Sequence, residues 1–459
     1  MAFLILVLVA TAAYAVYVVG LGLYRLFLHP LASFPGPKYA AVSRWHEAYY
    51  DVYRQGKFIF WIQRQHELYG PVVRITPDEL HFLDADLWET VFSKSGRVDK
   101  YDWLSSRFGN DTSVLTTAPH DLHRIRRGAL NPFFSRQRII GLQDAIRQKL
   151  DVLVSRVAEY EKLNAPMPIH RAYMAFSEDV IMRYCFGHDY AALSKDGFAP
   201  ILHDVFVGVT MAGNAALQFP LLPKIMNALP QSWIQSIDSN YKLIFQMQND
   251  FAKQIKAIKQ STEPEEKKRS TVFTDLINGP LPASEKEDRR LQDEAQLVIG
   301  AGLATTGWAL TVGTFYLLRS PDVLARLRQE LDEAIPTDSP SSSLNWADLE
   351  KLPYLTGVIK EAVRMSHSTT ARNVRRLPTP LQFKDWVIPA YTPISMTIPF
   401  LHYDEEIYPD PDSFKPERWL GSPKTENGSP LDRYFIGFGK GTRSCLGLNL
   451  AWCELHLRH

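Results

Sequence analysis

A glycine-rich segment near the end of the chain carries the side chain best suited to chemistry, Cys445. The segment reads Phe435-Ile436-Gly437-Phe438-Gly439-Lys440-Gly441-Thr442-Arg443-Ser444-Cys445-Leu446-Gly447. The mostly apolar run that follows, Leu446–Leu450 and then Ala451-Trp452, predicts a helix. The dipole and free amides of a helix start favour a thiolate over a thiol. A thiolate binds soft or redox-active metals, and flanking glycines let a flat cofactor approach the backbone.

Three alternatives compete with a metal-binding thiolate. The three alternating glycines resemble a dinucleotide loop, but the next position is Thr442 and no βαβ pattern surrounds it. A zinc site would need an uncommon spacing of its ligands, which would be Cys445, Cys453, His456 and His459. A buried, inert thiol is the usual fate of a lone cysteine.

The most informative predicted helix spans Gln292 to Arg319, about 28 residues and roughly 42 Å at helical rise. Each interior glycine costs about 1 kcal/mol relative to alanine, and this helix carries Gly300, Gly302, Gly307 and Gly313. Either a large group packed against the backbone or close neighbouring helices would explain them. A hydroxyl of Thr305-Thr306 can bond the carbonyl one turn earlier and open a local kink.

Length and composition limit the class of protein that positions these residues. The chain has 459 residues, with 51 basic and 50 acidic side chains, a net charge of +1 and 46% hydrophobic residues. These values exclude disorder for the bulk of the chain. They give no electrostatic reason to bind nucleic acid, so we expect no such partner. Three cysteines in a chain of this length cannot form a disulfide framework.

The amino terminus predicts a transmembrane anchor. Residues Met1–Tyr24 contain no charged side chain, and as a helix they would span roughly 36 Å, enough to cross a hydrocarbon core of about 30 Å. A cleaved signal peptide is the alternative, but the segment lacks a positively charged start. The first charges, Arg25, Lys38 and Arg44, follow the apolar run, which places the body in the cytosol.

The remaining chain shows mainly helical periodicity. A β pattern at Gly70–Leu83, with Pro77-Asp78 as its turn, predicts a hairpin, and a second β-like stretch runs from Leu381 to Ile398. Prolines within 25–37 predict a stiff hinge. We therefore expect an anchor at 1–24, a hinge at 25–37, and one large, mainly α-helical domain with a small sheet at 38–459.

Several motifs together resemble the cytochrome P-450 monooxygenase superfamily. Phe438-x-x-Gly441-x-Arg443-x-Cys445-x-Gly447 matches its haem-binding signature at every fixed position. Glu361-Ala362-Val363-Arg364 is similar to its Glu-x-x-Arg motif, and Phe414–Trp419 resembles the segment whose arginine, here Arg418, completes an ion-pair triad. Ala301–Thr306 looks like the oxygen-binding stretch of its long helix. The opening Tyr24–Leu31 and Phe34–Pro37 resembles microsomal members from filamentous fungi.

The resemblance implies a cytochrome P-450 fold with a haem b cofactor, iron protoporphyrin IX, and Cys445 as the axial ligand of the iron. That thiolate would push electron density toward bound dioxygen and favour O–O cleavage. The other cofactor-binding residues that the resemblance implies are Phe438 and Gly447. The basic residues Arg443, His123, Arg127 and Arg375 are implied as contacts of the haem propionates. Arg126 competes with Arg127, and Arg372 with Arg375; a solvated helix face is the alternative for Arg124, Arg126 and Arg127. Glu361, Arg364 and Arg418 would form a buried structural triad.

Two departures from the family pattern affect what the resemblance implies. The family's acid–threonine pair is here Ala304-Thr305. Thr305, the implied catalytic residue, can still bond the distal oxygen, but alanine cannot relay a proton. Protons must then arrive through a chain of water molecules, or the reaction must be one that depends less on this proton route. The chain ends at His459, fourteen residues after Cys445. Family members add a β-hairpin there, so we expect a shortened C-terminus that lacks one wall of the pocket.

The expected function is that of a haem-thiolate monooxygenase acting on an apolar terpenoid, polyketide or alkaloid in fungal secondary metabolism. The alternatives are a haem-thiolate isomerase or dehydratase that uses no external electrons, and a truncated, non-catalytic haem-binding protein. Electrons would come from NADPH through a separate NADPH-cytochrome P-450 reductase, which would dock near Lys440 and Arg443. The expected location is the endoplasmic reticulum membrane, with one pass through the lipid bilayer. Pocket walls are expected within Ile201–Leu229 and around Thr369-Thr370.

Overall fold

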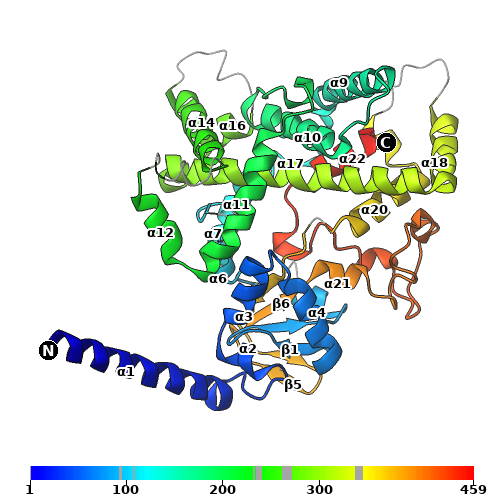
Figure 1. The fold of residues 1–459 in the computed structure, drawn as a ribbon. Helices are drawn as coiled ribbons and strands as arrows, with labels where there is room; N and C mark the ends of the chain where they lie inside the picture. The colour runs from blue at the N-terminus through cyan, green and yellow to red at the C-terminus, as the bar shows by residue number, and fades with distance from the viewer. Residues whose placement is uncertain are drawn as a thin grey trace.

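The computed structural model describes residues 2–92, 96–105, 107, 109–230, 233, 240–260, 271–335, 345–367 and 369–458. Helices dominate these residues, and a small sheet lies toward the amino-terminal side (Figure 1). The longer helices are α1 (Ala2–Leu23), α4 (Phe58–Tyr69), α7 (His120–Leu130), α9 (Gln143–Lys162), α10 (Ile169–Phe186), α11 (Ile201–Gln218), α12 (Leu221–Ala228), α14 (Asn240–Gln260), α16 (Val272–Asn278), α17 (Asp288–Arg319), α18 (Pro321–Ala334), α20 (Pro353–Ser366) and α22 (Leu448–Arg458). The predicted class, mainly α-helical with a minor sheet, is confirmed.

Short helices and turns connect these elements. The short α-helices are α2 (Lys38–Val42), α3 (Trp45–Ala48), α5 (Leu87–Val91), α6 (Asp102–Ser105), α8 (Arg136–Ile140), α19 (Trp346–Leu349) and α21 (Ile398–His402). Single π-helical or 3₁₀ turns are η1 (Tyr24–Leu28), η2 (Tyr49–Tyr53), η4 (Ala192–Ser194), η5 (Ala283–Lys286), η7 (Pro416–Trp419), η8 (Leu431–Arg433) and η9 (Gly441–Arg443).

Helix α17 crosses the body and is the centre of its core (Figure 1). It packs against α10, α11, α14, α20 and α22, and its buried side chains belong to the main hydrophobic cluster. The helix begins four residues before the predicted start, since Asp288 precedes Gln292 by four positions. Its first turns are polar, so apolar periodicity does not predict them. The ion pair Arg290–Glu294 (2.5 Å), four residues apart, stabilises these turns.

The glycines of α17 let two neighbouring helices approach its backbone. A Cβ at Gly307 would lie 2.8 Å from Sδ of Met174 and 3.1 Å from the carbonyl oxygen of Tyr173, both on α10. A Cβ at Gly300 would lie 2.3 Å from the Phe206 ring on α11. These contacts favour close neighbouring helices over a large cofactor as the reason for the glycines at these positions.

Two small sheets complete the fold. The first has the order β1-β2-β6-β3, built from β1 (Val72–Arg74), β2 (Leu80–Phe82), β6 (Pro393–Met396) and β3 (Asn373–Arg376). Strands β1 and β2 form the predicted antiparallel hairpin, with Pro77 and Asp78 in the connection. The second sheet pairs β4 (Leu381–Phe383) with β5 (Trp386–Ile388). The stretch Leu381–Ile398 therefore supplies strands to both sheets.

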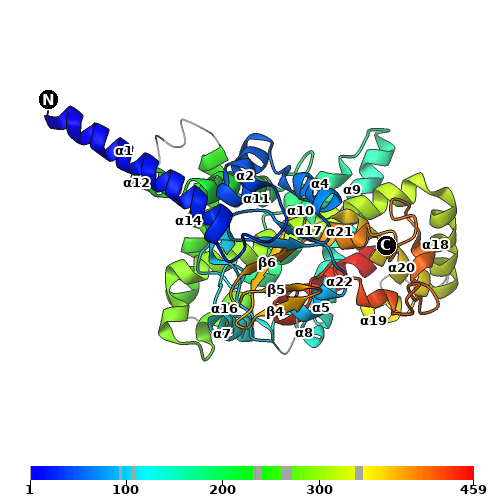
Figure 2. The same ribbon diagram turned by 90° about the horizontal axis from the view of Figure 1, so that it is seen from below.

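Helix α1 projects away from the body in both views (Figures 1 and 2). Together with η1 it forms a continuous apolar helix, Ala2–Leu28, long enough to cross a membrane and with no buried side chain in its most apolar window. Among the described residues α17 also passes this test by length and composition, but 61% of its most apolar window is buried inside the body. The helix Ala2–Leu28 is therefore compatible with a membrane anchor.

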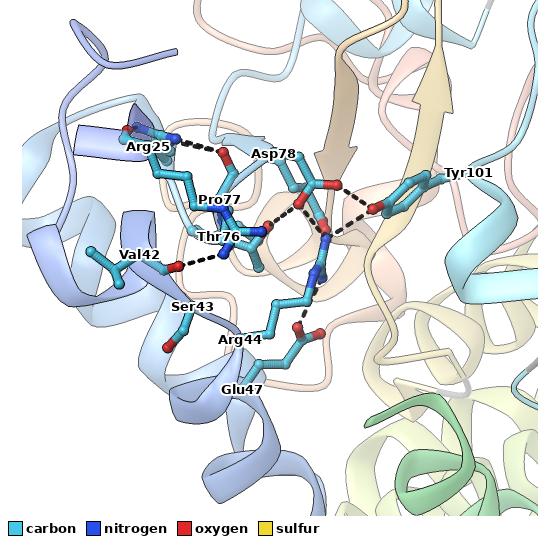
Figure 3. A network of polar contacts seen from close by, with 12 residues as sticks. Arg25, Val42, Ser43, Arg44, Glu47, Thr76, Pro77, Asp78 and Tyr101 are labelled. Carbon is cyan, nitrogen blue, oxygen red and sulfur yellow. Dashed lines mark hydrogen bonds and ion pairs between the residues drawn. The ribbon is translucent and has the colours of Figure 1, made fainter. Parts of the chain in front are cut away.

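A polar network fastens the end of this helix to the body (Figure 3). The Arg25 guanidinium donates to the carbonyl of Val42 (2.6 Å), and Arg74 donates to the carbonyl of Arg25 (2.9 Å). Beside it, Arg44 bridges Asp78 (2.6 Å) and Glu47 (3.0 Å), and Tyr101 donates to the same Asp78 carboxylate. The base of the projecting helix is thus held by charge-assisted hydrogen bonds.

Candidate functional site

The cysteine loop, Phe435–Gly447, contains η9 and ends just before α22, and backbone hydrogen bonds shape it. The Cys445 amide donates to the carbonyl of Phe438 (2.7 Å), which closes the loop on itself. Gly439 and Gly441 adopt φ values of 68° and 73°, a left-handed conformation that favours glycine. The Cys445 side chain is accessible to solvent, whereas Cys185 and Cys453 are buried. The loop therefore presents one thiol, and α22 begins three residues after it.

The acidity of Cys445 differs from the expectation based on the helix start alone. The Gly447 amide and the charge of Arg127 lower the pKa of the thiol, as a helix start and a nearby cation should. Although the side chain is accessible, the surrounding protein disfavours the charged form, and this desolvation raises the pKa overall. The predicted effect of the helix start is therefore present, but desolvation, which the sequence does not show, outweighs it in the protein alone.

Five basic side chains lie close to one another, and one of them, Arg127, also acts on the thiol. Lys100, His123, Arg127, Arg375 and Arg443 come from four separate segments of the chain. Burial and the neighbouring charges lower the pKa of Lys100 well below its ordinary value. The same causes lower the pKa of Arg375 to about 9, that of Arg443 to about 10 and that of His123 to about 2. The cluster concentrates positive charge, and desolvation and the mutual repulsion of its members lower the stability of the folded protein.

The members of this cluster bond to backbone carbonyls rather than to carboxylates. Arg127 donates to the carbonyl of Ser444 (2.6 Å), Arg443 to those of Thr117 and Ala118, and Lys100 to that of Leu115. No ion pair of the described residues involves Lys100 or the three arginines of the cluster, and Nε of Arg443 is buried without a hydrogen-bond partner there. Buried cations normally have anionic partners. The cluster therefore fits a bound group with two carboxylates, such as the propionates of haem.

Arg126 and Arg372, the alternatives to Arg127 and Arg375 in the sequence, have other partners. Arg126 pairs with Glu285 (2.8 Å) and donates to the hydroxyl of Thr117 (2.7 Å). Arg372 is bonded to Glu79 (2.6 Å) and Glu47. The structure thus places Arg127 near the thiol and Arg375 near Arg443, whereas Arg126 and Arg372 form ion pairs with other parts of the chain.

One face of α17 is accessible although the helix is buried on most sides. Ala301, Thr305 and Trp308 are exposed, while Leu303 and Leu310 are fully buried. The hydroxyl of Thr305 donates to the carbonyl of Ala301 (2.9 Å), so its lone pairs remain available to accept a hydrogen bond. Helix α17 also packs against α22, the helix that follows the cysteine loop.

The three residues of the expected triad lie together in the interior. Arg364 donates to both carboxylate oxygens of Glu361 (2.9 and 2.8 Å), and Arg418 donates to Glu361 (2.9 Å). Glu361 and Arg364 are fully buried. Trp419 also donates to Glu361 (2.9 Å), which completes the shell of a buried carboxylate.

A buried histidine links this triad to the cysteine loop. Arg364 donates to the carbonyl of His402 (2.7 Å), and Nδ1 of His402 lies 3.2 Å from the carbonyl of Arg364. Burial and Arg364 lower the pKa of His402 to about 3, so the ring is neutral, with its proton on Nδ1. Nε2 of His402 then accepts from the amide of Ile436 (3.3 Å), two residues before Phe438.

Sequence reasoning missed Lys100 and His402. Neither belongs to a motif that can be recognised from spacing, since each meets the site only through contacts between distant segments. The one available signal is the buried or half-buried position of a basic residue, which is visible only after folding.

Of the residues expected to form pocket walls, some line a cavity and others do not. Phe206 lines a small apolar cavity with Leu202, Met247 and Leu303. Val207, Met211 and Phe219 are largely exposed instead, and Phe219 packs against Trp45 (6.1 Å between ring centroids). A hollow of about 800 Å³ lies elsewhere, between α8, α9 and the end of α10, and has no residue of the cysteine loop in its lining.

Comparisons with known proteins agree with this geometry. Residues 49–458 match the family model described as Cytochrome P450. The cytochrome P450 monooxygenase sdnE of Sordaria araneosa is 42% identical over 457 residues, which cover 97% of this chain and 88% of that protein. The cytochrome P450 monooxygenase tpcC of Cochliobolus heterostrophus is 39% identical, over 99% of this chain and 86% of its own. The tryptophan 6-hydroxylase fscE of Fusarium equiseti is 38% identical, over 95% and 86%.

Proposed function

The chain belongs to the cytochrome P450 family, and from this premise we propose that it inserts one atom of O2 into a largely apolar small molecule. The observation that carries the proposal is one accessible thiol, Cys445, beside a cluster of buried and half-buried cations without carboxylate partners among the described residues. Haem, when bound, supplies the activation of dioxygen. The protein supplies the ligand, the orientation and the surrounding charge.

We assign the cofactor contacts as follows. Cys445 would hold the haem iron, and the half-buried ring of Phe438 and the backbone at Gly447 would contact the haem. Arg127, Arg375, Arg443 and Lys100 would neutralise the propionates, and His123 would donate one N–H to them. Since binding two carboxylates relieves the mutual repulsion of these cations, the same contacts stabilise the folded protein.

Thr305 orients a water molecule at the open face of α17. Its hydroxyl proton is committed to the Ala301 carbonyl, so the oxygen accepts a hydrogen bond from water. Ala304 packs against the hydrophobic core and offers no acid. Protons therefore reach the reaction through water along the exposed face rather than through a neighbouring carboxyl group.

The triad holds the cysteine loop in place without taking part in chemistry. Glu361 fixes Arg364, Arg364 fixes His402, and His402 fixes the Ile436 amide. Because each of these groups is buried, their hydrogen bonds hold the cysteine loop rigidly against the core. Preorganisation of a metal ligand by its neighbours is worth about 10–100-fold in affinity.

The proposed setting is the endoplasmic reticulum membrane, with the body in the cytosol. The helix Ala2–Leu28 carries its first charge at Arg25, on the side of the body. Electrons come from NADPH through a separate reductase. Lys440, which precedes the cysteine and pairs with Glu89 (3.2 Å), marks the proposed docking face.

The proposed role is fungal secondary metabolism, and the names of relatives support it at the level of class. One relative is named tryptophan 6-hydroxylase, and another, from Emericella nidulans, is named N-acetyltryptophan 6-hydroxylase. The substrate proposed for this chain is a compound with a large apolar or aromatic body, of terpenoid, polyketide or alkaloid type.

The test uses the full-length protein in membranes with its reductase. We expect a strongly red-shifted Soret band after reduction and carbon monoxide treatment, and loss of that band in Cys445→Ser. The matched control, Cys453→Ser, removes a buried thiol outside the loop and should keep the band. A normal band in Cys445→Ser, or substrate turnover that needs neither NADPH nor reductase, would contradict the proposal.

A further inference from the structure

One buried arginine of the sheet holds the end of the amino-terminal helix. Nη1 of Arg74, on strand β1, donates to the backbone carbonyl of Arg25 (2.9 Å), and its Nε and Nη2 donate to the carbonyl of Pro77 (3.1 and 2.6 Å). The Arg25 carbonyl is one of the last four of the helix Ala2–Leu28, which lie at the negative end of the helix dipole. A buried guanidinium is therefore a well-matched partner for this end of the helix.

The same arginine contacts the segment that joins the helix to the body. Its backbone amide donates to the carbonyl of Pro35 (2.7 Å). Gly36 lies so close to strand β1 that a Cβ there would be 2.6 Å from the carbonyl oxygen of Arg74. Phe34 is buried, and its ring stacks on that of Trp386 (4.7 Å between centroids). The joining segment is therefore packed onto the two sheets rather than left as a free tether.

Helix α2 supports the end of the amino-terminal helix at a second point. The Arg25 guanidinium donates to the carbonyl of Val42, the last residue of α2 (2.6 Å). Three residues before Arg25, a Cβ at Gly22 would lie 3.7 Å from Cγ1 of Val42, which is an ordinary packing distance. The backbone and the side chain of Arg25 are thus bonded to two different elements of the body. Attachment at two points resists a change in the direction of the helix.

The turn between β1 and β2 connects this attachment to the rest of the body (Figure 3). The carbonyl of Pro77 faces the sheet arginine, and the carboxylate of the next residue, Asp78, accepts from Arg44 (2.6 Å) and from Tyr101. Arg44 also pairs with the buried Glu47 (3.0 Å). The turn is therefore fixed from the body side by charge-assisted hydrogen bonds, so it does not move freely as an isolated hairpin tip would.

The charge of Arg74 depends on these same contacts. Desolvation lowers its pKa to about 10; the carboxylate of Asp78 opposes this shift, and the charge of Arg25 adds to it. Within the described part of the chain Arg74 forms no ion pair, and its side-chain hydrogen bonds all end on carbonyls. Because no carboxylate is bonded to it, movement of the Arg25 carbonyl would leave a buried N–H of this cation without a partner.

We infer that Arg74 fixes the direction in which the membrane helix leaves the body, so that this helix is a rigid arm that sets the orientation of the body at the bilayer. The inference rests on the proposed membrane setting and adds a defined angle to it. Helix α1 projects away from the body in both views (Figures 1 and 2). The 27 residues of Ala2–Leu28 span about 40 Å, so a change of about 15° at the junction would move the far end by about 10 Å.

The test is double electron–electron resonance on the full-length, haem-loaded protein in lipid nanodiscs. Spin labels are attached to Phe3→Cys, at the far end of α1, and to Glu67→Cys, at an exposed position of α4. The native cysteines do not take up the label, because two are buried and Cys445 is the proposed haem ligand. We expect one narrow distance distribution for the parent. Arg74→Met removes all three side-chain hydrogen bonds and should broaden the distribution at least about twofold, because the length of the helix magnifies motion at the junction.

Arg25→Gln is the milder variant, since it removes the bond to Val42 but keeps the backbone carbonyl that Arg74 holds. It should broaden the distribution less than Arg74→Met does. Arg54→Gln, which removes an exposed arginine just after η2, is the matched control and should keep the parent width. The reduced carbon monoxide spectrum of each variant shows whether the haem site is intact, and flotation with lipid vesicles shows whether the protein is bound to the membrane.

A parent distribution as broad as that of Arg74→Met would overturn the rigid arm, and so would a parent width in both Arg74→Met and Arg25→Gln. If Arg74→Met loses the carbon monoxide band, Arg25→Gln decides alone, and an unchanged width there overturns the inference. Either result, with a normal band in the parent, leaves the monooxygenase proposal standing. A parent protein that does not float with the vesicles would overturn the membrane setting and the rigid arm together.

Discussion

Arg127 on α7 donates a hydrogen bond to the carbonyl oxygen of Ser444, 2.6 Å away, one residue before Cys445. Its neighbour Arg126 points to another partner and pairs with Glu285. Successive residues of a helix differ by about 100° in direction, so two adjacent arginines serve two different purposes. One belongs to the cation cluster, and the other ties α7 to η5.

This division predicts different losses in the two variants. Arg127→Gln should lower the haem content per folded protein about five- to tenfold, because it removes one charge that would face a propionate. Arg126→Gln should lower the melting temperature and leave the haem-to-protein ratio of the folded fraction nearly unchanged, because its partner is structural. Pyridine haemochrome assays and thermal melts of the purified full-length protein measure both quantities. Equal haem loss in the two variants would refute the assignment of Arg127.

The triad predicts a large effect on stability. Glu361→Gln leaves the fully buried Arg364 without its charge partner, which should lower the free energy of unfolding by about 3–5 kcal/mol. The matched variant Glu417→Gln breaks the more exposed pair with Arg326 (3.1 Å) and should cost about 1 kcal/mol or less. Denaturant titration followed by tryptophan fluorescence compares them. A loss below about 1 kcal/mol in Glu361→Gln would show that the triad is dispensable.

The close approach of α10 to α17 predicts that a single methyl group is harmful. In Gly307→Ala the gain in helix propensity, about 1 kcal/mol, competes with a clash against Met174 and the Tyr173 carbonyl. Because one of these neighbours is backbone, overpacking should prevail and cost about 1–3 kcal/mol. Gly208→Ala on α11 meets nothing within 4 Å and should be neutral or stabilising. The same denaturant titration checks both variants, and equal outcomes would contradict the packing argument.

Two buried carboxyl groups predict a pH dependence of stability. Burial raises the pKa of Glu178 to about 8 and that of Glu454 to about 8. Between their ordinary pKa and about 8 the folded chain keeps protons that the unfolded chain has lost. The contribution of these two groups to stability should therefore fall as pH rises through this window and should level off above it. Because the lowered pKa values of His123 and His402 give the opposite slope below pH 6.5, melting temperatures of the full-length protein from pH 7 to pH 9 measure the effect.

Glu178→Gln should flatten part of this slope and raise stability at pH 8.5 by an amount on the order of 2 kcal/mol. The amide oxygen can still accept from the Leu202 amide, which the Glu178 carboxylate now caps at 3.1 Å. Asp322→Asn, on the exposed first turn of α18, is the control and should leave the slope unchanged. A slope in Glu178→Gln identical to that of the parent protein would rule out this carboxyl group as its source.

Much of the fold class was readable from local pattern. An uninterrupted apolar run is enough to define the amino-terminal helix as far as Tyr24, although the helix continues to Leu28, and the turn at Pro77-Asp78 is enough to define the hairpin. The cysteine loop was also readable, because its glycines and its ligand are contiguous and their backbone conformation is local. The glycines of α17 remained ambiguous in the sequence, since only the position of α10 and α11 shows what approaches them.

The sequence by itself determined the helical class, the apolar amino-terminal helix and the identity of the thiol, because each depends on neighbours in the chain. Tertiary structure alone decided which of two arginines meets the cysteine loop, brought Lys100 and His402 into the site and set the acidity of Cys445. These properties depend on desolvation and on charges brought together from distant segments, and both exist only once the chain has folded.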